Sequence, residues 1–239
     1  DVTATVYTDL NANGFKVRGT YADYNTSAAT YIYAAFADYP FERATTNQGY
    51  TIASSTRFDG ATQYLTRTPA GTVTTSTFSA WVKRSTFGTN QYLMNTRGTG
   101  AGFIRFITTD QITVCAILVS CVTTTGVYRD PSAWIHIVMT YDNVDLKIYV
   151  DNVLAGTVND PGDIIWRPAN TMGIGRASNN AVEYFSGYIA DVNFVDGSAL
   201  TPSSFGQTDS NGNWGPKSYS GAYGTNGFHL DFSDASNPG

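Results

Sequence analysis

The chain has 239 residues, which is enough for one large domain, or for one domain with part of another. Its net charge is −5 and its densest basic spot is Lys83-Arg84, which argues against nucleic acid as a partner, because phosphate neutralisation needs grouped Lys and Arg. Abundant Val, Ile, Tyr and Phe residues and 23 glycines argue against a helical bundle and favour short strands joined by turns.

The first part of the chain shows a weaker pattern than the rest. Residues 1–50 include a predicted strand at 29–37 but are too short for a core of their own. We expect them to be the C-terminal strands of a preceding β module plus a connector, with a strand pair packed on the main domain as the alternative, and residues 51–239 to form the main domain. The chain starts without Met and has neither a leader peptide nor an apolar run of about 18 residues. We therefore read it as a piece of a longer polypeptide without membrane insertion.

The main domain predicts one strand after another. Segments rich in β-branched and aromatic residues, bounded by turn formers, lie at 77–85, 102–108, 133–142 and 146–152. In the last of these, Leu146, Ile148 and Val150 share one face, which indicates a strand with one buried side. The surrounding turns predict a meander from residue 134 to 158. The only helix expected is one turn that starts at Pro202, with Thr201 as its cap.

An ordered series of segments carries a resemblance to a known family. The segments are "TRFDGATQYLTRTPAG", "TFSAWVKRS", "DPSAWIHIVMTYDN", "LKIYVDNVLAG", "MGIGRAS", "YFSGYIADVNFVDGSALTPSSFG" and "YGTNGFHLDF". The series spans 56–232 and resembles a laminin-G-like, concanavalin-A-like jelly-roll domain, most of all the version found in tail-fibre and structural proteins of marine bacteriophages. The resemblance implies an all-β fold, an antiparallel two-sheet jelly-roll sandwich. Closure of such a jelly roll also implies that the first strand, around 57–65, pairs near the last, around 227–232, in the same sheet.

The resemblance has consequences for place and partners. It implies a virion protein, at a tail fibre or at the particle surface, that functions outside the cell. The partners it implies are other copies of the parent polypeptide, neighbouring virion proteins and, for a recognition module, a host cell-surface glycan. Two functions stay open: glycan recognition or adhesion, and a purely structural spacer or decoration of the particle. Fold alone does not decide between them.

The stretch 185–206 combines carboxylates and polar groups with a strand pattern, so it is interpreted either as an active site or as part of the structural scaffold. In the resembled fold, Phe185, Gly187 and Ile189 lie on a central strand, where glycine lets a neighbouring group approach closely. Asp191 is interpreted as a carboxylate that holds the following turn, with a metal or sugar ligand as the alternative.

Hydrolysis of polysaccharide is the enzymatic alternative, because glucanases share the jelly roll. Those enzymes carry a Glu-x-Asp-x-x-Glu pattern on one strand, whereas Glu42 and Glu183 are the only glutamates here and lack that spacing. Aspartate pairs fall at turn positions, namely Asp142 with Asp145 and Asp160 with Asp163. We therefore expect no catalytic residue.

Both histidines, His136 and His229, fall in strand patterns, and the sequence lacks a Ser-centred nucleophile elbow. We interpret the two histidines as packing residues.

The two cysteines, Cys115 and Cys121, lack the spacing of a metal-binding pair. If a tight turn falls at 118–120, they face each other across a hairpin and can form a disulfide; if the strand continues, they are about 20 Å apart. The apolar residues between them argue against a turn, whereas the strand layout of the resembled family argues for one. Both outcomes stay open.

Calcium is the one cofactor that the sequence raises. Asp209, Asn211 and Asn213 alternate and can present three oxygens to one ion, and laminin-G-like folds hold calcium at a loop rim. The loop lacks glycine at its sixth position and a closing acidic residue, and Asn-Gly is also an ordinary turn. We expect no cofactor, with calcium at this loop as the alternative.

The four tryptophans fall into two groups. Trp81 and Trp134 lie in strand patterns and are expected in or near the core, whereas Trp166 and Trp214 lie in loops, where an indole beside amides can stack on a sugar. The candidate glycan contacts are Trp166, Asn179, Asn180, Tyr184, Trp214, Tyr219 and Tyr223. The alternative is that the loop tryptophans hold their own loops or pack on a neighbouring subunit.

Overall fold

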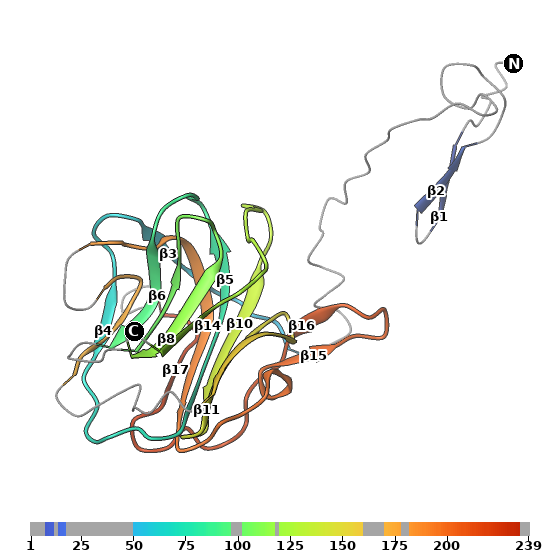
Figure 1. Ribbon diagram of the computed structural model, residues 1–239. Helices are drawn as coiled ribbons and strands as arrows, with labels where there is room; N and C mark the ends of the chain where they lie inside the picture. Colours follow the sequence, from blue (N-terminus) through green and yellow to red (C-terminus); the bar gives the residue numbers. More distant parts are fainter. Residues whose placement is uncertain are drawn as a thin grey trace, which may run out of the picture. The chain divides into compact units, whose positions relative to one another are not determined.

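The computed structural model describes residues 8–11, 14–17, 50–96, 102–117, 120–159, 170–177 and 182–234. The chain divides into two compact units, residues 1–40 and 41–239. In the first unit, β1 (Thr8–Asn11) and β2 (Gly14–Val17) form an antiparallel hairpin (Figure 1). The strand predicted at 29–37 lies outside the described residues.

The second unit contains two large antiparallel sheets. In the seven-stranded sheet the order is β12-β11-β10-β5-β14-β17, and β3 also pairs with β14. Its strands are β3 (Thr56–Asp59), β5 (Ser76–Arg84), β10 (Ile135–Tyr141), β11 (Asp145–Val150), β12 (Val153–Asn159), β14 (Ser186–Asp196) and β17 (Phe228–Leu230). The six-stranded sheet has the order β4-β13-β6-β7-β8-β9. Its strands are β4 (Leu65–Arg67), β6 (Gln91–Thr96), β7 (Phe103–Phe106), β8 (Ile112–Ile117), β9 (Ser120–Thr123) and β13 (Met172–Ile174).

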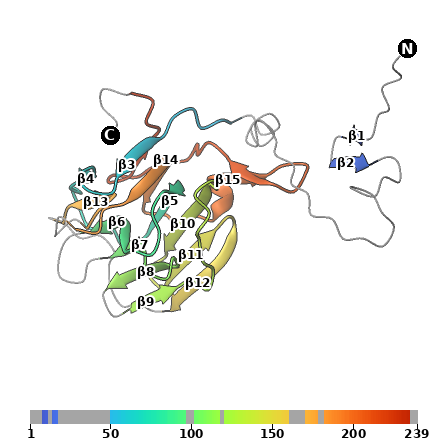
Figure 2. The same cartoon turned by 90° about the horizontal axis from the view of Figure 1, so that it is seen from above.

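The two sheets form two layers around one hydrophobic core, as Figure 2 shows. Aromatic rings fill its centre: Phe58 meets Phe185 edge-on at 6.1 Å between ring centroids, and Phe106 stacks on Phe185 at 6.4 Å. The predicted fold class, an antiparallel two-sheet jelly-roll sandwich, is confirmed.

Local sequence patterns explain several of these strands. Leu146, Ile148 and Val150 of β11 all lie in the core, and β10, β11 and β12 form the predicted meander. The predicted helical turn is present as η1 (Pro202–Ser204), with Pro202 in its first turn. Thr201 differs from the prediction, because its hydroxyl makes no capping hydrogen bond and instead lies 2.8 Å from that of Ser203.

The first and last strands of the sandwich lie in the same sheet, as predicted. β3 pairs with residues 186–189 of β14, and β17 pairs with residues 192–194. They therefore lie one after the other along the same side of β14, and each is paired to β14. Leu65, the last residue of the predicted first strand, belongs instead to β4 of the other sheet.

Gly187 on β14 allows the close approach that the sequence predicted. A Cβ atom at this position would overlap the carbonyl oxygen of Lys83 on β5, and the backbone has a φ of +150°. The central pairing of the seven-stranded sheet therefore depends on the absence of a side chain at this position.

After β14 the chain folds back over the outer side of the seven-stranded sheet, where β15 (Gly206–Thr208) and β16 (Trp214–Pro216) form a ribbon (Figures 1 and 2). Outer-face side chains that alternate with core residues are consequently buried, among them Ser79, Trp81 and His136. This face carries the candidate site described below.

Cys115 and Cys121 form a disulfide between β8 and β9. The two residues are directly opposite each other in the strand register, so the hairpin alternative is the one observed. Cys115 is fully buried, whereas Cys121 is exposed.

Replacing both cysteines by alanine should lower the free energy of unfolding by about 2 kcal/mol, because the short loop is no longer constrained in the unfolded chain. Urea unfolding monitored by tryptophan fluorescence measures the difference. Reductant should destabilise the wild type and leave the double variant unchanged. An equal response of both proteins to reductant would contradict the disulfide.

Candidate functional site

Three rings from three strands stack on the outer face of the seven-stranded sheet. The His136 ring on β10 stacks on Trp81 of β5, with 4.8 Å between ring centroids, and on Trp214 of β16 in the ribbon, with 5.9 Å between ring centroids. Trp214 also covers Gly206, where a Cβ atom would overlap the indole. The ribbon is therefore attached to the sheet through an aromatic stack.

Hydrogen bonds fix the protonation state of His136. The indole N–H of Trp214 donates to His136 Nδ1 over 3.1 Å, and His136 Nε2 lies 2.8 Å from Ser79 Oγ. Because an indole nitrogen only donates, Nδ1 accepts, and Nε2 carries the proton and donates to Ser79. Burial lowers the pKa of His136 to about 3, so the ring is neutral. A neutral ring that already holds its proton on Nε2 does not remove a proton from Ser79.

A second cluster surrounds Asp191, where a β-bulge interrupts the pairing of β14 with β5. Asp191 has a φ of +48°, an uncommon conformation that aspartate tolerates better than most residues. Its Oδ1 accepts a hydrogen bond from the Tyr50 hydroxyl over 2.9 Å and lies 2.7 Å from Nε2 of His229. The structure differs here from the sequence interpretation, because the carboxylate contacts residues distant in sequence and not the turn that follows it.

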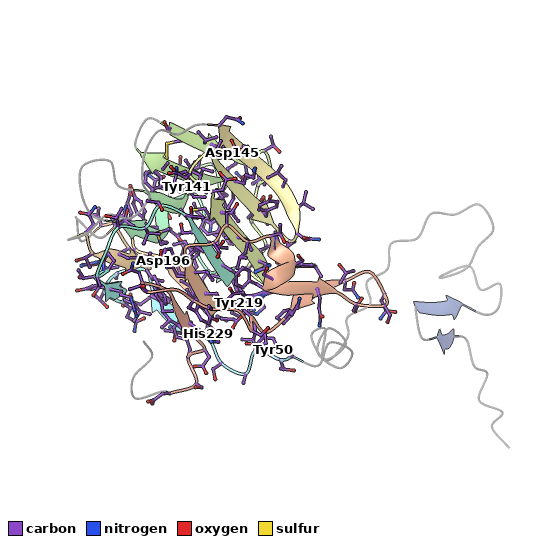
Figure 3. The ribbon with its side chains drawn as sticks, turned by 90° about the horizontal axis from the view of Figure 1, so that it is seen from below. Tyr50, Tyr141, Asp145, Asp196, Tyr219 and His229 are labelled. Carbon is purple, nitrogen blue, oxygen red and sulfur yellow. A yellow bond between two sulfur atoms is a disulfide. The ribbon has the colours of Figure 1, made fainter. Side chains whose placement is uncertain are left out.

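The Asp191 cluster continues through amide and hydroxyl groups. Asn193 Nδ2 lies 3.4 Å from Asp191 Oδ2, and the Tyr223 hydroxyl donates to Asn193 Oδ1 over 2.6 Å. Tyr223 also stacks on His229 at 6.1 Å and meets Tyr219 edge-on at 5.1 Å. Figure 3 shows Tyr50, Tyr219 and His229 on the same side of the sandwich.

The buried carboxylate changes the titration of its partners. The hydrogen bond to Asp191 raises the pKa of His229. Burial, and then the charge of Asp191, raise the pKa of Tyr223 to about 12, and the same two causes raise the pKa of Tyr50. Both phenols therefore stay protonated at neutral pH and act as hydrogen-bond donors.

The pKa values of the two histidines should be shifted in opposite directions from the ordinary value of about 6.5. His229 should protonate above that pH, so its pair with Asp191 stabilises the fold below pH 6.5 and loses this contribution as pH rises through the raised pKa. His136 should stay neutral down to about pH 3, so it costs stability as pH falls below 6.5, where only the unfolded chain takes up the proton. NMR titration of the imidazole protons measures both values, and His229→Gln assigns the signals. Two titrations near pH 6.5 would contradict the arrangement.

A family model described as the concanavalin A-like lectin/glucanases superfamily matches residues 58–205. This chain belongs to that superfamily. A second model, a domain of unknown function (DUF7483), matches residues 1–40. No curated protein sequence matches the chain.

Solved structures of the same fold share little sequence with this superfamily member. One is a native heptameric SAP-like pentraxin from Limulus polyphemus, with a TM-score of 0.51 and 16% identity over 64% of this chain and 80% of the pentraxin chain. Another is domain 4 of AbnA, an extracellular arabinanase of Geobacillus stearothermophilus, solved with arabinotriose. Its TM-score is 0.51 and its identity 16%, over 62% of this chain and 73% of that one. At these low identities, the structural likeness shows a common fold and nothing beyond it.

The superfamily includes glucanases, but the acidic residues described here have structural contacts. Glu183 pairs with Arg105 at 3.5 Å and accepts a hydrogen bond from Asn90 over 3.0 Å. Asp142 accepts from the backbone N–H groups of residues 144 and 145, as expected for an aspartate that closes a turn. Asp160 and Asp163 lie outside the described residues.

The structure brings together only some of the predicted contact residues of this superfamily member. Trp214, Tyr219 and Tyr223 all lie over the outer face of the seven-stranded sheet and are half-buried. Tyr184 belongs to a different cluster, where it packs on Tyr64 and accepts a hydrogen bond from Arg176 over 3.3 Å. Trp166, Asn179 and Asn180 lie outside the described residues.

The predicted calcium loop is the turn between β15 and β16. Asp209 Oδ1 accepts from the backbone N–H groups of Asn211 and Asn213, and Oδ2 accepts from the Asn213 side-chain amide over 3.1 Å. These hydrogen bonds make Asp209 the carboxylate that closes this turn, and calcium at this loop stays an untested prediction. Elsewhere in the described ranges, no three His, Cys, Asp or Glu side chains are grouped as metal ligands.

The prediction that Trp81 lies in or near the core is confirmed, because its side chain is only 8% exposed. The sequence did not indicate that Trp81 faces the ribbon on the outer side of the sheet and not the space between the sheets. Trp134, which was expected in or near the core too, is half-buried just before β10 begins. The outward position of Trp81 follows from its alternation with Ala80 and Val82, which face the core.

Within the described part of the chain, no helix has the length and apolar character needed to span a membrane.

Proposed function

We propose that this domain is a non-catalytic carbohydrate-recognition module of a virion structural or tail-fibre protein that acts outside the cell. The observation that carries the proposal is the collection of half-buried aromatic rings on the outer face of one sheet, namely Trp214, Tyr219 and Tyr223. Aromatic faces combined with hydroxyl and amide donors suit sugar rings, which present an apolar face and a polar edge.

Further support comes from the fold and from the resemblance. A domain of the same fold, in the arabinanase of Geobacillus stearothermophilus, was solved with arabinotriose. The assignment to a virion rests on the resemblance of the ordered strand segments to bacteriophage tail-fibre domains. Its expected partners are other copies of the parent polypeptide, neighbouring virion proteins and a host-surface glycan.

The chemistry of the site supports binding without catalysis. His136 is neutral and holds its Nε2 proton toward Ser79, and Glu183 is paired with Arg105. Neither residue is arranged as a general acid or base beside a second carboxylate, as glycoside hydrolysis requires. Reducing-end assays on soluble β-glucans and algal polysaccharides should therefore show no release of sugar.

A glycan array tests the function. One stacked ring contributes about 1 to 2 kcal/mol, so a single site should bind at about millimolar affinity and a multimerised sample should bind measurably. We expect the multimerised wild type to bind, and Trp214→Ala to bind less, with Trp166→Ala as the comparison for the other loop. Thermal melting confirms that the variants fold. If the wild type binds no glycan, the structural role in the particle becomes the better conclusion.

A further inference from the structure

A cavity of about 360 Å³ opens on the outer side of the seven-stranded sheet. Trp81 and Ala190, which are directly opposite each other on β5 and β14, form its floor. The segment Ile52–Ser55, just before β3, lines it on one side, and Trp214–Pro216 of β16 lines it as well. Trp134 completes the lining. Three of the chain's four tryptophans therefore line the cavity.

The lining has the chemistry of a site for an uncharged ligand. All of the described residues that line the cavity are uncharged, and its only side-chain hydroxyls belong to Ser54 and Ser55. Asp191 follows Ala190, and its carboxylate is held by Tyr50, two residues before Ile52. Because the described lining also offers no cationic side chain, nothing in it would compensate the charge of an anionic ligand.

One donor at the cavity has no acceptor in the described part of the chain. Nε1 of Trp81 is buried and makes no hydrogen bond, whereas Nε1 of Trp214 donates to His136. Buried N–H groups in folded proteins are nearly always paired, with protein or with another molecule. Nε1 itself is closed to solvent in this structure, so an oxygen of a bound molecule would accept from it after a small shift of the Trp81 indole or of the 52–55 segment.

We propose that this cavity binds one ring of a neutral saccharide, with the apolar face of the sugar against the indoles of Trp134 and Trp214 and a sugar oxygen accepting from Trp81. The proposal rests on the carbohydrate-binding function proposed above and places it in a particular site and ligand class. The volume is at the small end of the range of about 300 to 1,000 Å³ that is usual for ligand pockets, which suits a short saccharide segment.

The test compares variants that change the cavity with a matched variant outside it. Ala53 is exposed and lines the cavity, so Ala53→Trp fills the space without removing any core contact. Ala61, in the bend after β3, is also exposed and is not among the residues that line the cavity, and Ala61→Trp is the control. Trp81→Phe removes the unpaired donor and keeps an aromatic ring, and Trp134→Ala removes a stacking surface.

The probes are the neutral oligosaccharides arabinotriose and cellotriose and the acidic trigalacturonate, titrated by NMR after the array has given the wild-type result. We expect the wild type to prefer neutral sugars, and Ala53→Trp and Trp134→Ala to weaken binding about tenfold or more, whereas Ala61→Trp binds as the wild type does. Trp81→Phe should weaken binding by a smaller factor, since it removes one hydrogen bond.

Each outcome separates the two proposals. If Ala53→Trp and Trp134→Ala bind sugars as well as the wild type does, the cavity is not the site, and the carbohydrate-binding function still holds. The same conclusion follows if the wild type binds only acidic sugars. A wild type that binds no sugar on the array or in solution overturns both. A change of oligomeric state in Ala53→Trp, with unchanged sugar binding, assigns the cavity to a second copy of the chain and also overturns the proposal.

Discussion

Replacing Gly187 by alanine should destabilise the sandwich by about 3 to 5 kcal/mol, through backbone strain and overpacking together. The added Cβ atom would overlap the Lys83 carbonyl oxygen and approach the Phe185 ring to 3.0 Å. The nearest atom belongs to the backbone of β5, so the conflict is relieved only by separating the two central strands. Chemical denaturation followed by tryptophan fluorescence measures the loss.

Gly197 provides a matched control for this prediction. It also has a positive φ, +89°, but nothing lies within 4 Å of the Cβ position. Gly197→Ala should therefore show only the backbone cost of about 1 to 2 kcal/mol. Equal losses in the two variants would mean that β14 and β5 do not approach as closely as described.

Replacing Asp110 by alanine should have an effect of similar size, about 3 to 5 kcal/mol, because it leaves a buried cation without its partner. Asp110 Oδ1 lies 3.1 Å from Arg84 Nη2 and accepts from the Gly88 backbone N–H over 2.7 Å, while Oδ2 is 2.7 Å from Arg129 Nε. The side chains of Arg84 and Asp110 are 2% and 3% exposed. Although burial opposes ionisation, the hydrogen bonds from Gly88, Arg129 and Arg84 hold the pKa of Asp110 below its usual value.

An ion pair nearer the surface serves as the control, because it shows how much stability is lost when a paired aspartate that is not deeply buried is removed. Asp145 lies 3.1 Å from Lys147, with both side chains more accessible than those of Arg84 and Asp110. Asp145→Ala should cost less than about 1 kcal/mol of unfolding free energy. If the two aspartate variants lose the same stability, the Asp110 network does not act as a buried, paired charge.

Features carried by neighbouring residues were predictable from the sequence. Alternation in β11 placed Leu146, Ile148 and Val150 in the core, and the turn formers around β11 predicted the meander. Gly187 was predictable because a glycine within an apolar strand often marks a close approach. In each case the physical cause acts within a few residues of chain.

The candidate site was less predictable because its contacts are distant in sequence. Tyr50 and Asp191 are separated by 141 positions, and Ser79 and His136 by 57. The bulge that turns Asp191 toward Tyr50 and His229 has no pattern in the sequence, since aspartate also suits ordinary turns. Trp214 was recognised as a binding candidate from its loop, but its stack on His136 depends on how the ribbon folds back over the sheet.

The position of the family match relative to the cavity has a consequence for the choice of ligand. The match spans 58–205, which includes the floor residues Trp81 and Ala190 as well as Trp134. The lining segments 52–55 and 214–216 both lie beyond its ends. If the cavity binds the proposed sugar, changes in these two short flanking segments would alter which ligand it takes, while the sandwich and its core stay the same.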